Sequence, residues 1–259
     1  MRGLMTTSVA HHNSSTGTRA LGTRLGLVIL VSLPAFLLVA LIAVAVEGSW
    51  APLQRLDGSV STHMHQLALG HPAWVSAMVW ISDIGSPTVL RALIVVMAVV
   101  LWLRGARRLA LWAAATIAGG ALIDVVLKAA VGRARPHFTH PVATAPGGSF
   151  PSGHAFTATL AAGVLLLWAL PLLSPGGRIA AWIGAALVPV AVGASRVALG
   201  VHWLSDVVGG WILGAGLLAA TSAAFETWRS QRGMRSVHPV TEGVAPEESQ
   251  SSVHMDETP

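Results

Sequence analysis

Long uncharged apolar runs alternate with short polar segments along this chain. Runs of this kind cover residues 25–46, 88–103, 109–127, 155–173, 179–195 and 207–225. A helix rises 1.5 Å per residue, so roughly 20 apolar residues cross the ~30 Å hydrocarbon core of a bilayer. Arg91 lies near the start of the second run, where its side chain is expected to reach for the interface. The pattern predicts an all-α, polytopic membrane protein with six transmembrane helices.

The segments outside these runs are polar or mixed. Residues 1–24 are rich in Ser, Thr and Gly, and we expect them to form a cytoplasmic tail. Residues 47–87 carry three tryptophans among scattered polar groups, which is typical of helices lying at the membrane surface. Residues 227–259 become acidic towards their end and are expected to be a disordered cytoplasmic tail. The membrane domain is therefore expected to cover residues 25–226, with interfacial helices in 47–87.

The composition agrees with a membrane protein. Of the 259 residues, 53% are hydrophobic and 10% are charged, whereas a soluble domain carries roughly a quarter charged residues. The mean hydropathy is +0.66. The absence of cysteine excludes disulfide frameworks, thiolate metal sites and cysteine nucleophiles. The net charge of +5 comes from fifteen arginines and one lysine that form no patch, so we expect no nucleic-acid partner.

The positions of the arginines predict the orientation in the membrane. Cytoplasmic segments of membrane proteins carry an excess of Lys and Arg. With six spans and a cytoplasmic N-terminus, ten arginines fall inside: Arg2, Arg19, Arg24, Arg104, Arg107, Arg108, Arg178, Arg229, Arg232 and Arg235. We therefore expect a multi-pass protein of the cell membrane with both termini in the cytoplasm. Ala43-Val44-Ala45 resembles a signal-peptidase site, but the long apolar run before it favours a retained anchor.

Three polar clusters are expected to lie at the outer ends of the spans. They are Lys128 to Pro136 after the third span, Pro151 to His154 before the fourth, and Ser195-Arg196 after the fifth with His202 and Asp206 before the sixth. Together they supply cations, two imidazoles, a carboxylate, a hydroxyl and a helix N-terminus. Cations and amide groups hold phosphate oxygens, and two imidazoles can divide the roles of nucleophile and acid. The set suits chemistry on a phosphoryl group.

Each cluster alone also has a plainer structural explanation. His202 and Asp206 could share an ordinary helix-surface hydrogen bond, and Ser152 with Gly153 could form an N-cap turn. Lys128 and Arg135 could set the topology, and Arg196 could simply reach the interface.

Neighbouring polar residues receive weaker interpretations. Asp124 lies one turn before Lys128 and could pair with it or form a structural hydrogen bond, and Arg133 is interpreted as a charge at the rim. His63, His65 and His71 have no carboxylate cluster nearby, so we expect no metal there.

The ordered set fills the pattern K-x6-R-P, P-S-G-H, S-R-x5-H-x3-D at every position. In this it resembles the type 2 phosphatidic acid phosphatase superfamily of lipid phosphate phosphatases. The same active-site pattern occurs in vanadium haloperoxidases and glucose-6-phosphatase. The resemblance extends over about residues 25–226.

The resemblance implies a role for each residue. His202 would attack phosphorus and form a phosphohistidine, with Asp206 orienting the ring and His154 protonating the leaving group. The phosphate oxygens would be held by Lys128, Arg135, Ser152, Gly153 and Arg196. No metal or other cofactor is expected, because three cations already neutralise the phosphate charge.

The expected function is a membrane-embedded phosphatase for a lipid phosphomonoester or diphosphate at the outer face of the membrane. Phosphatidate, phosphatidylglycerol phosphate and polyprenyl diphosphate are the candidate substrates. The alternative is a lipid phosphotransferase that uses the same phosphohistidine with an acceptor other than water. Six apolar spans disfavour a haloperoxidase, and a transporter or scaffold leaves the complete pattern unexplained. The expected partners are the lipid substrate and the bilayer, with no protein partner indicated.

Overall fold

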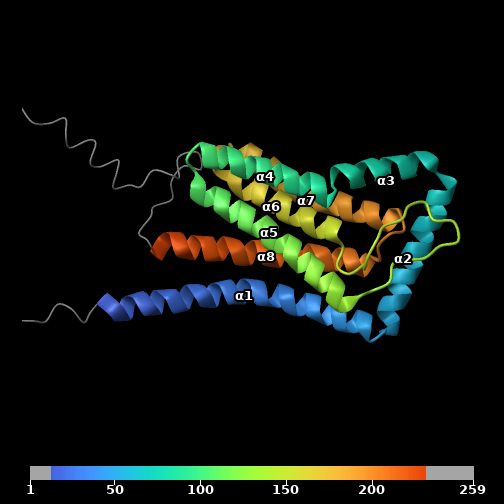
Figure 1. The fold of residues 1–259 in the computed structure, drawn as a ribbon, viewed down its shortest axis with the longest axis horizontal. Helices are drawn as coiled ribbons and strands as arrows, with labels where there is room; N and C mark the ends of the chain where they lie inside the picture. Colours follow the sequence, from blue (N-terminus) through green and yellow to red (C-terminus); the bar gives the residue numbers. More distant parts are fainter. Residues whose placement is uncertain (1–12, 232–259) are drawn as a thin grey trace, which may run out of the picture.

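A computed structural model describes residues 13–231, and every regular element in that part of the chain is a helix (Figure 1). The elements are α1 (Asn13–Glu47), α2 (Ala51–Gly70), α3 (Pro72–Ile84), α4 (Pro87–Leu103), α5 (Arg107–Val131), α6 (Gly153–Ala169), a 3₁₀ turn (Leu170–Leu172), α7 (Pro175–Ala198) and α8 (Leu204–Gln231). The all-α prediction is confirmed. Residues 1–12 and 232–259, which hold half of the predicted N-terminal tail and most of the predicted C-terminal tail, lie outside the described residues.

Five stretches are long and apolar enough to cross a membrane. They are Pro72–Leu103, Arg107–Val131, Gly153–Leu172, Pro175–Ala198 and Leu204–Trp228. The pair Ser32–Glu47 and Ala51–Gly70, bent by 87°, meets the same criterion jointly and brings the number to six. The predicted multi-pass architecture is confirmed.

The helices extend beyond the predicted apolar runs. α1 begins at Asn13, twelve residues before the apolar run, and α8 continues to Gln231. Hydropathy marks only the apolar part of a helix and therefore underestimates helix length where polar residues continue it.

The segment 47–87 forms the helices α2 and α3, which take different courses. α2 turns away from α1 and crosses the end of the bundle, whereas α3 continues the apolar stretch of α4 (Figure 1). The break between α3 and α4 contains Gly85 and Ser86, and the Ser86 hydroxyl accepts a hydrogen bond from the Val89 amide at the start of α4. Apolar residues on both sides of the break join α3 and α4 into one candidate span.

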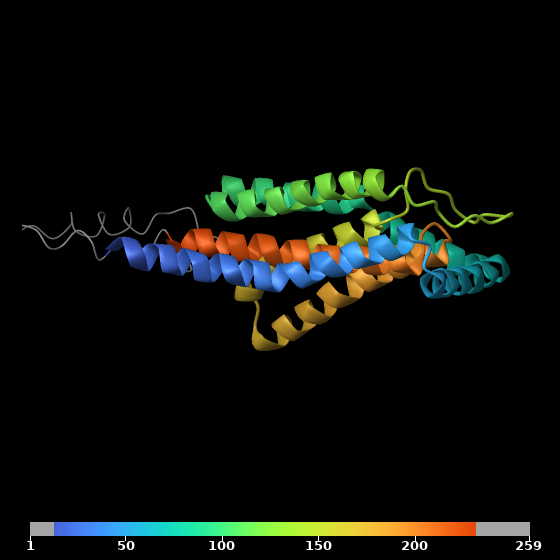
Figure 2. The same ribbon diagram turned by 90° about the horizontal axis from the view of Figure 1, so that it is seen from below.

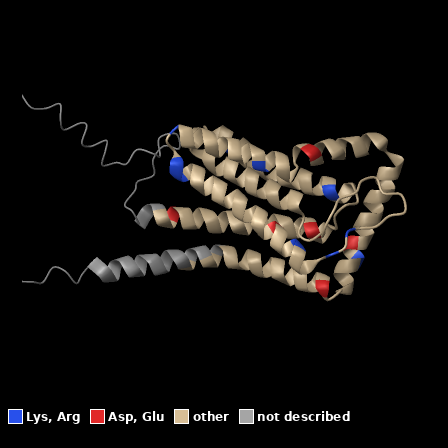
Figure 3. Ribbon diagram, in the orientation of Figure 1, with Lys and Arg blue, Asp and Glu red and all other residues tan. Residues whose placement is uncertain are grey.

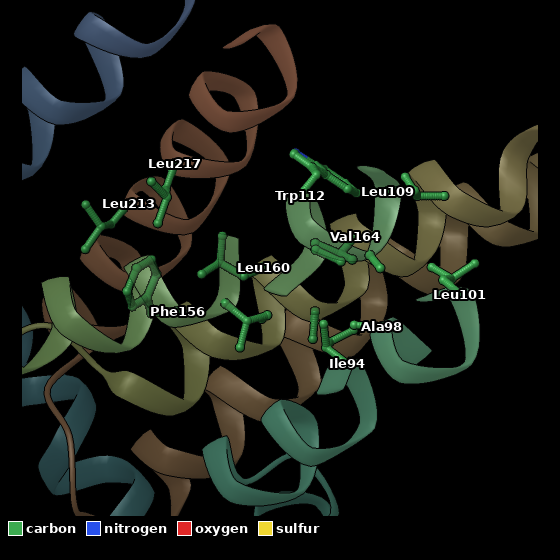
Figure 4. Close-up of a cluster of buried hydrophobic side chains, with 14 of the residues drawn as sticks. Ile94, Ala98, Leu101, Leu109, Trp112, Phe156, Leu160, Val164, Leu213 and Leu217 are labelled. Carbon is green, nitrogen blue, oxygen red and sulfur yellow. The ribbon is translucent and has the colours of Figure 1, made fainter. Parts of the chain in front are cut away.

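α6 occupies the middle of the bundle, where it packs against α4, α5, α7 and α8. Its side chains Phe156, Leu160 and Val164 are fully buried in the main apolar cluster (Figure 4). A helix with apolar residues on all sides is expected in such a central position. α1 runs alongside α8 on the outside of this core (Figures 1 and 2).

Two glycines allow α8 to approach α6 closely. A Cβ atom at Gly210 would lie 2.8 Å from the Ser152 carbonyl oxygen, and one at Gly214 would lie 2.7 Å from the Thr159 Cβ. Small residues at this spacing permit close packing of membrane helices. The N-terminal turns of α6 and α8 are thereby held side by side.

The charged residues gather towards the two ends of the bundle (Figure 3). One end carries α2, the loop 132–152 and the first turns of α6 and α8; the other carries the loops after α4 and α6 (Figures 1 and 3). α7 diverges from the bundle at the second end (Figure 2). Its last turns return to α3, α6 and α8 at the first end, which holds the residues described next.

Candidate active site

The ends of four helices bring the three sequence clusters together. α5 ends at Gly132, which has a left-handed conformation (φ 58°) that glycine adopts without strain. The backbone amide of Ser152 donates to the Asp206 carbonyl oxygen at 2.9 Å and joins the starts of α6 and α8. Lys128 and Asp206 are 78 positions apart in the sequence, but both lie against the start of α6, Lys128 at Gly153 and Asp206 at Ser152.

His202 lies between a carboxylate and a guanidinium. Its Nδ1 is 3.3 Å from Asp206 Oδ2, and its Nε2 is 3.0 Å from Arg135 Nη1. Asp206 Oδ2 also accepts the Trp203 amide at 2.9 Å, which fixes the carboxylate. Burial lowers the pKa of His202 below its ordinary value, against the opposing effect of Asp206. The ring is therefore neutral near pH 7, and a proton on Nδ1 leaves the lone pair on Nε2.

Arg135 holds the loop around His202. Besides the His202 contact, Nη1 donates to the Val201 carbonyl at 2.7 Å. Nε donates to the Gly147 carbonyl, and Nη2 donates to the carbonyls of Pro146 and Gly148. These bonds use all five N–H groups of the guanidinium. Arg135 can therefore bind a phosphate oxygen only by giving up one of these hydrogen bonds. The hydrogen bond to His202 Nε2 is the one that involves the proposed reacting nitrogen.

Two buried donors in the site have no partner among the described residues. They are the Ser152 hydroxyl and Arg196 Nε. Arg196 is held from its other side, because its Nη1 donates to the Ser82 hydroxyl at 2.5 Å. Buried polar groups in native proteins are nearly always satisfied. An oxyanion bound beside Ser152 and Arg196 would supply the missing acceptor.

Lys128 belongs to an ion-pair cluster at the same end. Its Nζ lies 2.8 Å from Asp124 Oδ2, so the pair considered from the sequence is present. Arg91 Nη2 lies 3.9 Å from the same carboxylate oxygen and 3.5 Å from the Thr157 hydroxyl. The Arg91 side chain is 32% exposed and approaches a carboxylate on the neighbouring helix, and its reach for the interface stays a prediction.

His154 lies in the first turn of α6 with its ring half-buried. The ionisable groups near it are Arg196, His202, Lys128 and Arg135. The structure thus brings all eight sequence-predicted residues into one region: His202, His154, Asp206, Lys128, Arg135, Ser152, Gly153 and Arg196.

Arg133 was interpreted as a rim charge, and the structure shows that this is wrong. Its side chain is only 12% exposed and bridges two buried carboxylates: Nη1 lies 2.5 Å from Asp206 Oδ1, and Nη2 lies 2.7 Å from Asp57 Oδ2. The guanidinium also stacks over the Trp203 ring at 5.4 Å. A buried position for this arginine is possible because two carboxylates compensate its lost hydration.

Sequence reasoning missed Asp57 altogether. A signal was available, because the buried residues of α2 are Asp57, Ser61, His65 and Ala68, at intervals of one helical turn. A polar stripe on the buried face of a helix indicates contact with a polar site. His65 stacks on Phe138 with the ring centroids 3.9 Å apart, a packing role. Residues 13–231 contain no group of three His, Asp or Glu placed to hold a metal ion.

Comparison with known proteins agrees with this geometry. A family model described as the PAP2 superfamily matches residues 109–230, which span α5 to α8. Phosphatidylglycerophosphatase B of Bacillus subtilis (strain 168) is 42% identical over 96 residues, covering 36% of this chain and 46% of that relative. An undecaprenyl-diphosphatase of Sulfolobus acidocaldarius is 43% identical over 67 residues, covering 26% of this chain and 29% of that relative. The chain thus matches less than half the length of either curated relative.

A solved structure extends the similarity over most of the fold. The crystal structure described as the first transmembrane PAP2 type phosphatidylglycerolphosphate phosphatase from Bacillus subtilis aligns with a TM-score of 0.68 and 29% sequence identity. The alignment covers 76% of this chain and 96% of that one. Together with the family match over α5 to α8, which carries the whole signature, this shows that the chain is similar to the PAP2 superfamily in both sequence and fold.

Proposed function

We propose that this protein is a membrane-embedded lipid phosphate phosphatase that works through a phosphohistidine on His202. The observation that carries the proposal is the position of His202, whose two ring nitrogens face Asp206 and Arg135. The names of its relatives support a lipid substrate, since they act on phosphatidylglycerophosphate and undecaprenyl diphosphate. We infer the same class here, a lipid phosphomonoester or diphosphate.

The first chemical step transfers the phosphoryl group to His202. The Nε2 lone pair attacks phosphorus, and the bond from phosphorus to the leaving oxygen breaks as His154 donates a proton to that oxygen. Asp206 accepts a hydrogen bond from Nδ1 and stabilises the positive charge that develops on the ring. The products are the dephosphorylated lipid and phosphohistidine.

The second step returns His202 to its starting state. A water molecule gives a proton to His154 and attacks phosphorus, the P–N bond breaks, and inorganic phosphate leaves. His154 thus acts first as an acid and then as a base, so the proton balance closes over one turnover.

The phosphate oxygens have enough ligands within the protein. Lys128, Arg135 and Arg196 supply positive charge, and the Ser152 hydroxyl is a buried donor without another partner among the described residues. The Gly153 amide lies at the start of α6, where helical N–H groups lack intrahelical acceptors. Arg135 would move its hydrogen bond from His202 Nε2 to a phosphate oxygen when that nitrogen bonds to phosphorus. In this mechanism the cations take the place of a metal ion.

We further propose that the site faces the outer side of the membrane and that both termini are cytoplasmic. Four arginines lie at or beside the α4–α5 and α6–α7 connections, at the end of the bundle opposite the site: Arg104 after α4, Arg107 and Arg108 at the start of α5, and Arg178 in the first turn of α7. An excess of arginine marks the cytoplasmic side in membrane proteins. At the site end, Lys128, Arg135 and Arg196 have chemical roles in the mechanism and so need not follow that rule.

The test is a panel of lipid phosphates in detergent, assayed for inorganic phosphate. Phosphatidate, phosphatidylglycerol phosphate and a polyprenyl diphosphate should include at least one substrate for the full-length protein, and H202A should release phosphate from none. Consumption of lipid without stoichiometric phosphate would instead identify the phosphotransferase. Unchanged turnover in H202A, or no reaction with any lipid, would overturn the proposal.

A further inference from the structure

We infer that Asp57 and Arg133 are positioning residues that set the charge Asp206 presents to His202. The inference rests on the proposed function, because it concerns the same nucleophile. It adds a residue of α2, a helix outside the segment 109–230 that matches the family model.

The four side chains form one continuous chain of contacts. Asp57 Oδ2 lies 2.7 Å from Arg133 Nη2, and Arg133 Nη1 lies 2.5 Å from Asp206 Oδ1. The other oxygen of Asp206 lies 3.3 Å from His202 Nδ1. The side chains of Asp57, Arg133 and Asp206 are 2%, 12% and 0% exposed. Interactions among charges so removed from water are screened far less than those at a surface.

Asp57 is fixed in place from the α8 side. Its Oδ1 accepts the Ser205 amide at 2.9 Å, and its Oδ2 accepts the Ser205 hydroxyl at 2.5 Å. Arg133 Nη1 also donates to the same hydroxyl oxygen at 2.7 Å. Because Ser205 directly precedes Asp206, a change in Asp57 is transmitted to Asp206 through Ser205 as well as through Arg133.

The net charge of Asp57, Arg133 and Asp206 determines how well a positive His202 ring is stabilised. If Arg133 faced Asp206 alone, the pair would be neutral and would stabilise a positive His202 ring poorly. Asp57 balances Arg133, so the three groups together carry one negative charge, and Asp206 presents it to Nδ1. That charge is needed when His202 becomes a positively charged phosphoimidazole.

The other charged groups that face His202 come from three different elements. They are Arg135 in the loop 132–152, Arg196 on α7 and His154 on α6. All three are retained in the variants proposed below. Differences in the pH profile between those variants therefore report the effect of Asp57 and Arg133 on His202.

The prediction is a pair of opposite pH shifts. D57N removes a negative charge, which disfavours a positive His202, so the acid limb of the pH profile of kcat should move to lower pH. R133Q removes a positive charge, which favours a positive His202, so the acid limb should move to higher pH. The double variant D57N/R133Q should lie between them, near the wild type. Each single shift should be on the order of half to one pH unit.

The rate should change with the charge as well. D57N should lower kcat by up to about tenfold, because the charged intermediate loses part of its stabilisation. R133K keeps the positive charge but not the two-pronged geometry, so its kcat should fall while its acid limb stays near that of the wild type. When one lipid is used throughout, protonation of its phosphate affects the pH profile of every variant equally and cannot cause differences between them.

Matched controls separate this effect from general changes in surface charge. Glu47 at the end of α1 and Arg55 on α2 are exposed and close in sequence to Asp57. E47Q and R55Q should leave the pH profile unchanged. A purely structural role for Asp57 and Arg133 predicts loss of folded protein in both single variants, and no opposite shifts in the material that folds.

A second measurement requires no substrate. Diethyl pyrocarbonate modifies neutral imidazole, so the pH dependence of its reaction at His202, followed by mass spectrometry of the peptide, reports the same protonation. Opposite shifts of that midpoint in D57N and R133Q support the inference even if no lipid in the panel is hydrolysed, a result that would count against the proposed function alone. Shifts in the same direction, no shifts, or an R133Q effect confined to KM would overturn the inference.

Discussion

Lys128 lies directly against Gly153. A Cβ atom at position 153 would come within 2.8 Å of Lys128 Nζ and 2.9 Å of Asp124 Oδ2, distances that real Cβ contacts do not show. Glycine at the start of α6 therefore allows the ion pair to lie against the helix N-terminus. In G153A the ammonium group of Lys128 and the carboxylate of Asp124 must shift to make room for the methyl group.

G153A is expected to lower kcat/KM by about tenfold to a hundredfold, since one displaced charge-assisted hydrogen bond is worth about 1.5–3 kcal/mol. The measurement is phosphate release from the best lipid substrate. G119A is the control, because position 119 on α5 has open space for a Cβ atom. Equal activity of G153A and G119A would show that the close contact is not needed for turnover.

The sequence predicts the core of the site well, because its signals are local. His202 and Asp206 are four residues apart at the start of α8, and Ser152, Gly153 and His154 are consecutive at the start of α6, so short sequence separation keeps the members of each group near one another. The relations across helices are different. The contact of Arg133 with Asp57 joins residues 76 positions apart, and no spacing rule anticipates it.

For the fold, too, local sequence signals are predictable and contacts between distant segments are not. Apolar runs identify the helices, because burial in a bilayer requires them. The course of α2 across the end of the bundle depends on packing against α7 and α8, which hydropathy does not register.

Ser82 is a second residue that only the structure identifies. Its hydroxyl accepts from Arg196 Nη1 at 2.5 Å and lies on α3. S82A should leave Arg196 less well oriented and raise KM by about threefold to tenfold, with a smaller change in kcat. S76A, an exposed position on the same helix, is the control for steady-state kinetics. If KM rises equally in S82A and S76A, the cause is a general disturbance of α3 and not the loss of the hydrogen bond to Arg196.

The proposed orientation can be tested by labelling, since the chain has no native cysteine. Thr139 is exposed in the loop at the site end, and Gly176 is exposed near the start of α7 at the opposite end, with open space around it. T139C should react with an impermeant maleimide in intact cells, and G176C should react only after permeabilisation. The reverse pattern would place the site in the cytoplasm.

Removal of metal should leave the activity unchanged. The proposed ligands of the phosphate are Lys128, Arg135, Arg196 and neutral donors, so turnover should persist in excess EDTA. Vanadate should inhibit, because its trigonal-bipyramidal form on His202 resembles the transition state of phosphoryl transfer. The assay is phosphate release with and without each reagent. A loss of turnover in EDTA that Mg²⁺ restores would contradict a mechanism based on these cations alone.

The two histidines should respond differently to replacement. H202A should abolish turnover of every substrate, since no phosphohistidine can form.

In the wild type the acid limb of the pH profile of kcat should lie below pH 6.5, because burial lowers the pKa of His202 from that ordinary value and keeps the nucleophile neutral. An acid limb well above pH 6.5 would contradict a neutral, buried His202 as the titrating group.

H154A should instead show a loss that depends on the leaving group. General acid catalysis is worth about 10²–10⁴-fold, and less of it is needed when the leaving group is a weaker base. The loss should therefore be largest for alkyl phosphate monoesters, smaller for lipid diphosphates and smallest for nitrophenyl phosphate, whose phenolate leaves without a proton. The comparison requires kcat for all three substrates and a check that H154A is folded and monodisperse. An equal loss on all three would assign His154 to phosphate binding, because a lost oxygen ligand affects every substrate alike.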